Sequence, residues 1–282
     1  MTGTNRDEAV VDGFGDEWTR FDQSGLGETE KAEIFDAYFS LFPWTDLPDH
    51  AQGADIGCGS GRWASLVAPR VDTLHCIDPS EAALRVARLN LAAHAGVRFH
   101  CASVDELPIP DRSLDFAYSL GVLHHVPDTA AAIRSCVRLL KPGAPFLVYL
   151  YYAFDNRPTW FRRLWQISDM LRRTVSRAPH GLRAALSALL AGTVYLPLAR
   201  SASLAARHGR DVEAWPLSFY RDRSFYVMRN DALDRFGTRL ERRFTRDQVA
   251  RLLTQAGLHD LQFREGAPYW VALGRAPAAT SE

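Results

Sequence analysis

Patterns that bind metal or form disulfides are missing from this sequence. Its 282 residues include four cysteines, and none of them forms a C-x-x-C pair. A zinc site and a disulfide framework are therefore both disfavoured, and a reducing compartment is favoured. Near the N-terminus no basic segment leads into an apolar run, so no signal peptide is expected. We expect a cytoplasmic protein without a metal site.

The sequence also lacks net charge and a long apolar run. Its formal net charge at pH 7 is zero, which excludes a uniformly basic surface for nucleic acid. The longest uncharged stretch, residues 184–199, is shorter than the ~20 residues that a membrane span needs. We therefore expect no transmembrane helix and no nucleic-acid partner.

What the sequence does have is enough apolar residues for a substantial core and an uneven distribution of charge. Hydrophobic residues make up 47% of the chain and charged residues 23%, as in ordinary globular proteins. Residues 153–243 contain 17 arginines, no lysine and 8 acidic residues, a net charge of +9. This basic part either complements the acidic remainder or faces an anionic partner, and the sequence leaves both alternatives open.

Short strands and helices alternate along much of the chain, which indicates right-handed strand–helix–strand crossovers. The predicted strands are residues 54–56, 73–77, 97–101, 114–119, 145–152, 261–264 and 269–273. The last two are joined by a short link containing Gly266 and Pro268, which is typical of a hairpin. The prediction is an α/β fold with a doubly wound, Rossmann-like sheet of seven strands, the last one antiparallel.

The same pattern predicts how the chain is divided. Residues 1–48 are expected to form an N-terminal helical cap segment. Residues 49–152 and 241–282 are expected to form the α/β core. Between them, residues 153–240 are rich in Arg, Trp, Leu and Ala and predict a mainly helical insertion after strand five, where a substrate would be selected.

A glycine-rich turn follows the first predicted strand. Gly57, Gly59 and Gly61 allow a ligand to approach the backbone closely, and Asp78 ends the second strand 21 residues after Gly57. A carboxylate at that place suits the two hydroxyls of a ribose. The sixth position of the dinucleotide fingerprint holds Arg62 instead of glycine. A nucleoside-containing cofactor is therefore expected over the carboxyl ends of the first two strands.

The surrounding residues resemble the class I S-adenosylmethionine-dependent methyltransferases, in particular the small-molecule branch that includes ubiquinone- and menaquinone-type enzymes. The resemblance covers residues 50–152 and 245–275. It rests on five ordered motifs: Ala54–Arg62, Ile77-Asp78, Leu107–Asp111 leading into Leu114-Asp115-Phe116, Gly121–Val126, and Leu140–Gly143.

The resemblance implies S-adenosylmethionine as cofactor and assigns residues to it. The glycine loop would lie beneath its methionine part, Asp55 would orient the ammonium group, and Asp78 would bind the ribose. Ser103 stands where many members carry an aspartate that faces the adenine amine, which is a departure from the family pattern. The implied cofactor-binding residues are Trp18, Arg20, Asp55, Gly57, Gly59, Gly61, Asp78, Pro79, Ser103, Val104, Ser119 and Leu120.

Candidate catalytic and substrate residues follow the fourth and fifth strands. His124 or His125 could act as a general base, because imidazole titrates near neutrality; a purely structural role is the alternative. Candidate substrate-binding residues are Tyr151, Tyr152, Arg157, Tyr220, Arg221 and Tyr226. For these, the alternative is that they brace the insertion.

The predicted function is S-adenosylmethionine-dependent methyl transfer to an O, N or C nucleophile of a small organic molecule in a biosynthetic pathway. The alternative is a methyltransferase that acts on RNA or protein through the Arg-rich insertion. Apolar residues recur at helical spacing over 160–171, with arginines beside them. Such a helix could touch a membrane surface, cover the site or form a homodimer.

Overall fold

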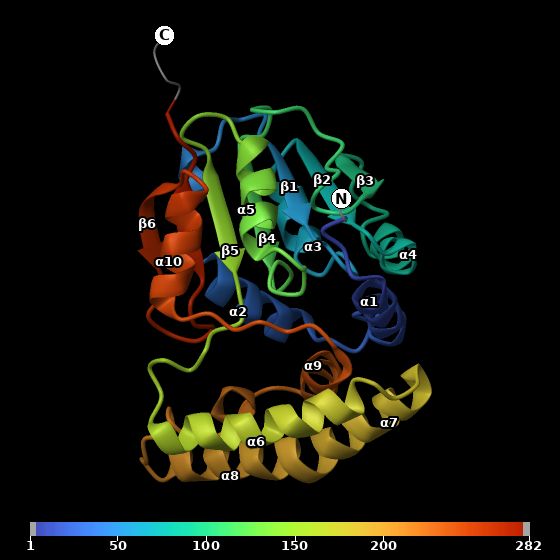
Figure 1. Ribbon diagram of the computed structural model, residues 1–282, viewed down its shortest axis with the longest axis vertical. Helices are drawn as coiled ribbons and strands as arrows, with labels where there is room; N and C mark the ends of the chain where they lie inside the picture. The colour runs from blue at the N-terminus through green and yellow to red at the C-terminus, as the bar shows by residue number, and fades with distance from the viewer. Residues whose placement is uncertain (1–3, 279–282) are drawn as a thin grey trace. The chain divides into compact units, whose positions relative to one another are not determined.

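The computed structural model describes residues 4–278 and divides into two compact units (Figure 1). The core unit consists of the described residues up to Asp22, of Ala32–Ala153, and of those from Leu240 onward. The helical unit consists of Gln23–Lys31 and Phe154–Arg239.

The core unit is built on one seven-stranded sheet in the order β3-β2-β1-β4-β5-β7-β6. The first five strands are parallel, and β7 is antiparallel to both β5 and β6. The predicted doubly wound sheet with an antiparallel last strand is thus confirmed. The strands are β1 Gln52–Ile56, β2 Thr73–Asp78, β3 Val97–Cys101, β4 Phe116–Leu120, β5 Pro145–Tyr149, β6 His259–Phe263 and β7 Ala272–Arg275.

Helices cover both faces of this sheet, because successive residues of a strand point to opposite faces. On one face, Phe146 and Val148 of β5 pack with α5 and α10. On the other face, Leu147 packs with Phe116, Tyr118 and the helices α2, α3 and α4. The helices are α2 Glu28–Phe39, α3 Ala64–Val67, α4 Glu81–Asn90, α5 Thr129–Arg138 and α10 Arg246–Gln255. Figure 1 shows α5 and α10 in front of the sheet and α2 behind it.

The polar segment before residue 30 contains a helix, α1 Glu8–Arg20. Asp7 caps it by accepting hydrogen bonds from the backbone N–H groups of Ala9 and Val10. Gly15 lets α1 lie against the start of α4, because a Cβ there would come within 2.7 Å of Ser80 Oγ. Tertiary packing therefore stabilises a helix that its own composition only weakly favours.

The helical unit has its own small core, and its helical character agrees with the prediction. Its helices are α6 Thr159–Val175, α7 His180–Leu190, α8 Leu196–Arg207 and α9 Phe225–Gly237, with a π-helical turn at Ala191–Tyr195 between α7 and α8. The buried apolar residues are Val175, Ala191, Tyr195, Ala199, Met228, Ala232 and Phe236. Apolar side chains from α6, α7, α8 and α9 thus share one interior.

Within residues 4–278, one continuous helical run, His180–Arg207, is long and apolar enough by length and composition to cross a membrane. Its most apolar window is 28% buried. Arg183 is buried inside the run and donates to the carbonyl of Gly237 on α9. A single segment of this kind is weak support for a membrane span.

A buried ion pair anchors α6. Asp169 Oδ1 lies 2.6 Å from Arg172 Nε, and both side chains are at most 10% exposed. Arg173 donates to the other carboxylate oxygen, and Arg172 also donates to the carbonyl of Thr238. These contacts hold α6 to the end of α9.

Replacement of Asp169 by alanine should lower the free energy of unfolding by about 3–5 kcal/mol, because a buried guanidinium loses its counter-charge. The matched control is Glu81→Ala, which removes a pair of equal length, 2.6 Å to Arg88, but with both side chains more than 40% exposed. The control should cost about 1 kcal/mol or less. Urea unfolding followed by circular dichroism measures both, and equal effects would contradict a structural role for burial of the Asp169 pair.

Candidate functional site

The glycine loop that joins β1 to α3 adopts a conformation that requires glycine. Gly57, Gly59 and Gly61 have φ angles of +80°, +53° and +76°, in the left-handed region that side chains disfavour. A Cβ on Gly57 would also meet the side chain of Val122 at 2.4 Å. The loop therefore brings its backbone close to the ends of the neighbouring strands.

Asp78, the last residue of β2, is bonded directly to this loop. Its Oδ2 accepts the N–H of Gly59 at 2.9 Å, and its Oδ1 accepts the N–H of Ser80 at 2.8 Å. Each oxygen keeps a further lone pair. Burial raises the pKa of Asp78 to about 6, although the two backbone N–H groups act to lower it. At neutral pH the carboxylate is mainly ionised and can accept more hydrogen bonds.

A second carboxyl group lies buried on β1. Asp55 is 3% exposed, and its Oδ2 has no hydrogen-bond partner. Burial raises the pKa of Asp55 to about 8; the nearby Tyr118 hydroxyl acts to lower it, and the charge of Asp78 raises it further. An unsatisfied buried carboxyl oxygen favours a cationic or hydrogen-bond-donating ligand at this place.

The residues after β3 form a polar pair. Ser103 is buried and donates through Oγ to Asp105 Oδ1 at 2.5 Å, while Asp105 Oδ2 accepts the N–H of Asn5 at 2.9 Å. The neighbouring Val104 is also buried. Sequence reasoning named Ser103 and Val104 but missed Asp105. The available signal was an acidic residue two positions beyond the place where the family usually carries one.

Three other predicted cofactor residues have mainly structural partners. Ser119, fully buried on β4, donates to the carbonyl of Ile56 at 2.8 Å and so ties β4 to the end of β1. Leu120 ends β4 and is half-buried. The carbonyl of Pro79 accepts the thiol of Cys101 at 3.7 Å.

Helix α1 lies over the ends of several strands. Trp18 packs on the glycine loop, since a Cβ on Gly59 would lie 2.7 Å from its Nε1. Phe14 makes an edge contact with His125, with ring centroids 5.0 Å apart. Arg20 instead pairs with Asp16 of the same helix at 2.8 Å, and its side chain is 42% exposed. Phe14 was not among the predicted site residues, because in the sequence only its spacing to Trp18 indicated it.

Both candidate catalytic histidines are buried after β4. His125 donates through Nδ1 to the carbonyl of Leu240 at 2.6 Å. Neither ring nitrogen of His124 has a hydrogen-bond partner in the described structure. Burial lowers the pKa of His124 well below its usual range, and His125 and Arg243 lower it further. His124 is thus a neutral imidazole with one donor and one acceptor unused.

The ring of Tyr151 lies against that of His124 at an angle of 31°, with centroids 3.9 Å apart. The guanidinium of Arg243 lies 5.1 Å from the Tyr151 ring centroid and pairs with Glu241 at 2.8 Å. Arg243 also donates to the carbonyl of Tyr152 at 3.3 Å. The segment that leads from the helical unit back into the core unit therefore places Arg243 at this site. The sequence analysis did not identify this residue, because the pair Arg242-Arg243 before α10 was the only indication of it.

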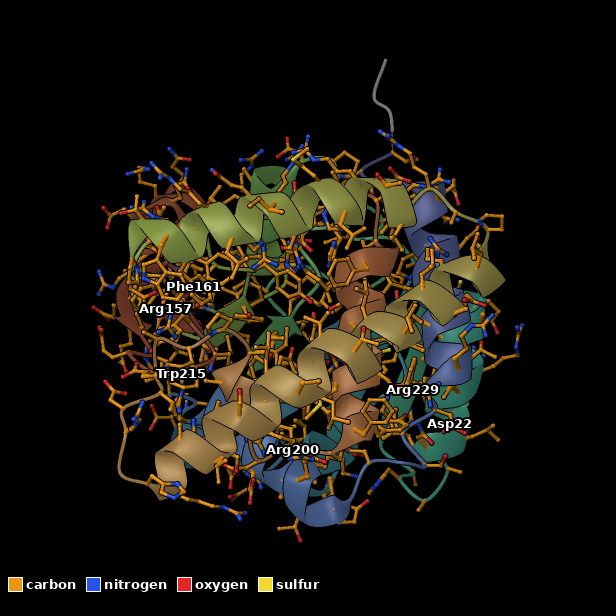
Figure 2. The ribbon with its side chains drawn as sticks, turned by 90° about the horizontal axis from the view of Figure 1, so that it is seen from below. Asp22, Arg157, Phe161, Arg200, Trp215 and Arg229 are labelled. Carbon is orange, nitrogen blue, oxygen red and sulfur yellow. The ribbon has the colours of Figure 1, made fainter. Side chains whose placement is uncertain are left out.

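The remaining predicted substrate residues belong to the helical unit and have partners within it. Arg157 donates to the carbonyl of Glu213 at 2.7 Å and lies over the ring of Phe161 (Figure 2). The hydroxyl of Tyr220 donates to Asp231 at 2.9 Å, and Arg221 pairs with Asp222 at 3.1 Å. The hydroxyl of Tyr226 accepts the N–H of Gln23 at 2.9 Å. These contacts brace the helical unit, and a substrate role for these residues stays a prediction.

The core-unit arrangement fits the cofactor that the resemblance implies. The carboxyl ends of β1, β2 and β4 bring together a glycine loop, two buried carboxyl groups and an unpartnered imidazole. Asp78 can accept from a pair of ribose hydroxyls, and the free oxygen of Asp55 can face an ammonium group. Within residues 4–278, no three His, Cys, Asp or Glu side chains gather as a set of metal ligands.

Comparison with known proteins supports this assignment. Residues 54–148 match the family described as "Methyltransferase domain". The chain is 43% identical over 91 residues to a ubiquinone biosynthesis O-methyltransferase of Alkalilimnicola ehrlichii, covering 32% of this chain and 37% of that protein. It is 32% identical over 133 residues to the protein of the same name from Xanthomonas oryzae, covering 46% of this chain and 54% of that protein. The chain thus matches only about half, or less, of these relatives' length.

Solved structures agree on the fold. A methyltransferase from Aquifex aeolicus superposes with a TM-score of 0.51 at 13% identity, covering 93% of this chain and 97% of that one. The CurJ carbon methyltransferase gives a TM-score of 0.55 at 11% identity, covering 94% of this chain and 59% of that one. With the sheet order, the glycine loop and Asp78 in place, residues 54–148 form a methyltransferase domain of the class I, S-adenosylmethionine-dependent family.

Proposed function

We propose that the protein transfers the methyl group of S-adenosylmethionine to a hydroxyl oxygen of a small organic molecule in a biosynthetic pathway. The observation that carries the proposal is the buried, neutral and unpartnered imidazole of His124 in the domain whose glycine loop is bonded to Asp78. The relatives named above are O-methyltransferases, which supports oxygen over nitrogen or carbon. The four cysteines are all free, which supports a cytoplasmic location.

The residues that would hold the cofactor differ in what they contribute. Asp78 would accept from the ribose hydroxyls while it keeps Gly59 and Ser80 in place. The free oxygen of Asp55 would face the ammonium group. The Ser103–Asp105 pair would supply the acceptor for the adenine amine that a single carboxylate supplies elsewhere in the family. When bound, the cofactor supplies a methyl group that its sulfonium charge has already activated.

The protein's task is then to align the acceptor, remove its proton and keep water out. His124 can accept the hydroxyl proton at its free acceptor nitrogen, because its low pKa keeps it neutral at physiological pH. Tyr151, which contacts both His124 and Arg243, would hold the imidazole in position. Trp18 and Phe14 of α1 cover the loop and the histidines with apolar surface.

A methyltransferase acting on RNA or protein is a second candidate, because the helical unit is strongly basic. Residues 154–239 contain fifteen arginines and seven acidic residues. A nucleic-acid substrate would bind with a steep dependence on salt, whereas a small neutral acceptor would not.

Asp78→Ala should weaken binding of S-adenosylhomocysteine by more than tenfold, because two hydrogen bonds from the ribose lose a charged acceptor. Titration calorimetry measures the dissociation constant. Asp72→Ala, which removes an exposed carboxylate just before the same strand, should leave it unchanged. NAD should not bind to either variant or to the wild type. Unaltered affinity in Asp78→Ala would place the cofactor elsewhere.

Cofactor affinity should rise by up to about tenfold from pH 5 to pH 7. The pKa of Asp78 is about 6 in the free protein, and a ligand that donates to the carboxylate favours its ionised form. For the stability of the cofactor-free protein, the pH dependence that comes from the buried carboxyl groups has the opposite sign. Since native Asp78 and Asp55 bind protons more tightly than they do in the unfolded chain, the stability that these two carboxyl groups contribute should fall as pH rises from about 4 to 8. The histidines His75 and His124 have lowered pKa values and therefore act in the opposite direction below about pH 6.5.

Calorimetry across pH measures the change in cofactor affinity, and thermal unfolding without cofactor measures the change in stability. Asp55→Asn should remove the decline in stability between about pH 6.5 and 8, where Asp55 is the buried carboxyl group that still titrates. Asp111→Asn, an exposed control on the loop before β4, should leave the profile unchanged. A pH-independent affinity would contradict an ionised Asp78 as ligand.

His124→Ala should lower kcat by about 10²–10⁴ with a phenolic acceptor and leave cofactor affinity unchanged, because only the proton acceptor is lost. The assay uses methyl-labelled S-adenosylmethionine with a panel of phenols, catechols and primary amines. His75→Ala is the control, since His75 is bonded to Gln52 and His100 on the sheet. Label transfer to amines alone, or to RNA or protein in an extract but to no small molecule, would overturn the proposed acceptor class.

A further inference from the structure

Helix α6 exposes a continuous apolar line. Trp160, Leu164, Ile167 and Leu171 recur at helical spacing, and all are at least 44% exposed. Met170, next to this line, is 71% exposed. Another side of α6 packs inward through Asp169, Arg172 and Val175. The helix therefore has two faces that favour burial, and only one of them is buried in the described structure.

The α7–α8 run repeats this feature. Its large exposed apolar residues are Leu182, Leu189, Val194, Leu198 and Leu204, three of them at least 53% exposed. In both views α6 and α7–α8 lie in one layer of the helical unit, with α9 in the layer behind (Figures 1 and 2). The two apolar lines thus belong to the same layer. Exposed apolar surface gathered in this way marks an interaction site.

The exposed charge of this layer has one sign. Over residues 159–207 the only acidic residue is Asp169, which is buried and paired. The exposed arginines of the layer are Arg162, Arg163, Arg173, Arg177, Arg200 and Arg207. With no exposed carboxylate among these helices, the layer is complementary to an anionic partner.

One pocket concentrates this charge. It has a volume of about 520 Å³ and is lined by Arg200, Ser203, Leu204, Arg207, Arg221 and Asp222. Arg200, labelled in Figure 2, donates to the carbonyls of Arg221 and Arg223 at 2.9 and 3.3 Å, which holds its guanidinium in place. Three arginines and one aspartate therefore line this pocket, beside the 59% exposed side chain of Leu204. A phosphate group attached to an apolar chain matches this combination.

We propose that the α6–α7–α8 layer docks on an anionic lipid bilayer. Its apolar side chains enter the boundary of the acyl chains, its arginines meet lipid phosphates, and the pocket binds one headgroup phosphate. Trp160 suits the interface between water and lipid. This docking is independent of the proposed methyl transfer, because none of its residues belongs to the core unit.

A bilayer fits this layer better than other partners do. In a symmetric dimer each face would meet its own copy, so the six exposed arginines would oppose six more without a counter-charge. Nucleic acid would match the arginines but would leave the leucines, Ile167 and Met170 in water. A surface that is both anionic and apolar satisfies both sets of side chains.

The test is flotation of the full chain with vesicles of phosphatidylcholine alone and with 30% phosphatidylglycerol. The wild type should float with the anionic vesicles and not with the neutral ones. Arg200→Ala combined with Arg207→Ala should lower partitioning about 25-fold, since each arginine near an anionic surface contributes about fivefold. Ile167→Asp combined with Leu204→Asp should lower it at least tenfold.

Matched controls come from the core unit. Leu89→Asp changes a leucine that is 79% exposed on α4, and Arg251→Ala changes an exposed arginine on α10. Neither should alter flotation. Binding of S-adenosylhomocysteine and the circular dichroism spectrum confirm that each variant is folded, so loss of vesicle binding is distinguishable from loss of the methyltransferase site.

Three results would overturn the proposal: no flotation with anionic vesicles, equal flotation of wild type and both double variants, or equal loss in the core-unit controls. Light scattering after gel filtration gives a further check. A wild-type dimer that Ile167→Asp with Leu204→Asp converts to a monomer would assign the layer to self-association instead. A monomeric wild type that floats only with anionic vesicles supports the proposal.

Discussion

The carboxylate of Asp78 is the group on which the candidate site depends. One oxygen accepts the N–H of Gly59 and so closes the glycine loop; the other accepts the N–H of Ser80, whose Oγ in turn caps α4 at Ala83. One buried side chain thus joins the end of β2 to the loop after β1 and to the start of a helix. Its location at the carboxyl edge of a parallel sheet is also where ligands of doubly wound folds bind.

Burial of this carboxylate costs stability, and other buried polar groups of the site also lower stability. Asp55 keeps an unpaired oxygen and His124 keeps two unpaired nitrogens inside the protein. Each is unfavourable for folding alone, because an unsatisfied buried polar group loses its hydration. Such groups are expected where a ligand supplies the missing partner. The apolar cover of Trp18 and Phe14 adds the low-dielectric surroundings in which these groups act most strongly.

Arginine serves two purposes in the helical unit. Arg172 and Arg183 are buried and donate to backbone carbonyls at the end of α9, where they hold helices together. The exposed arginines of α6 and α8 lie beside apolar side chains, on helices whose only carboxylate is the buried Asp169. Arginine suits both tasks because its planar group makes several hydrogen bonds and stays charged when partly buried. Stability and surface recognition are therefore supplied by the same residue type in different environments.

The sequence by itself determined the sheet, the glycine loop and Asp78, because strand alternation, left-handed turns and the spacing from Gly57 are local properties. It also indicated a helical insertion from composition. Tertiary structure alone decided the rest. Helix α1 packs closely on the start of α4 at Gly15. His124 is kept neutral mainly by its burial, and Arg243, which is distant in sequence, adds to the effect. Likewise, only packing shows that Tyr220 and Tyr226 have partners inside the helical unit. The burial of a side chain and its hydrogen-bond partners depend on segments that are distant in sequence, so a local sequence pattern does not predict them.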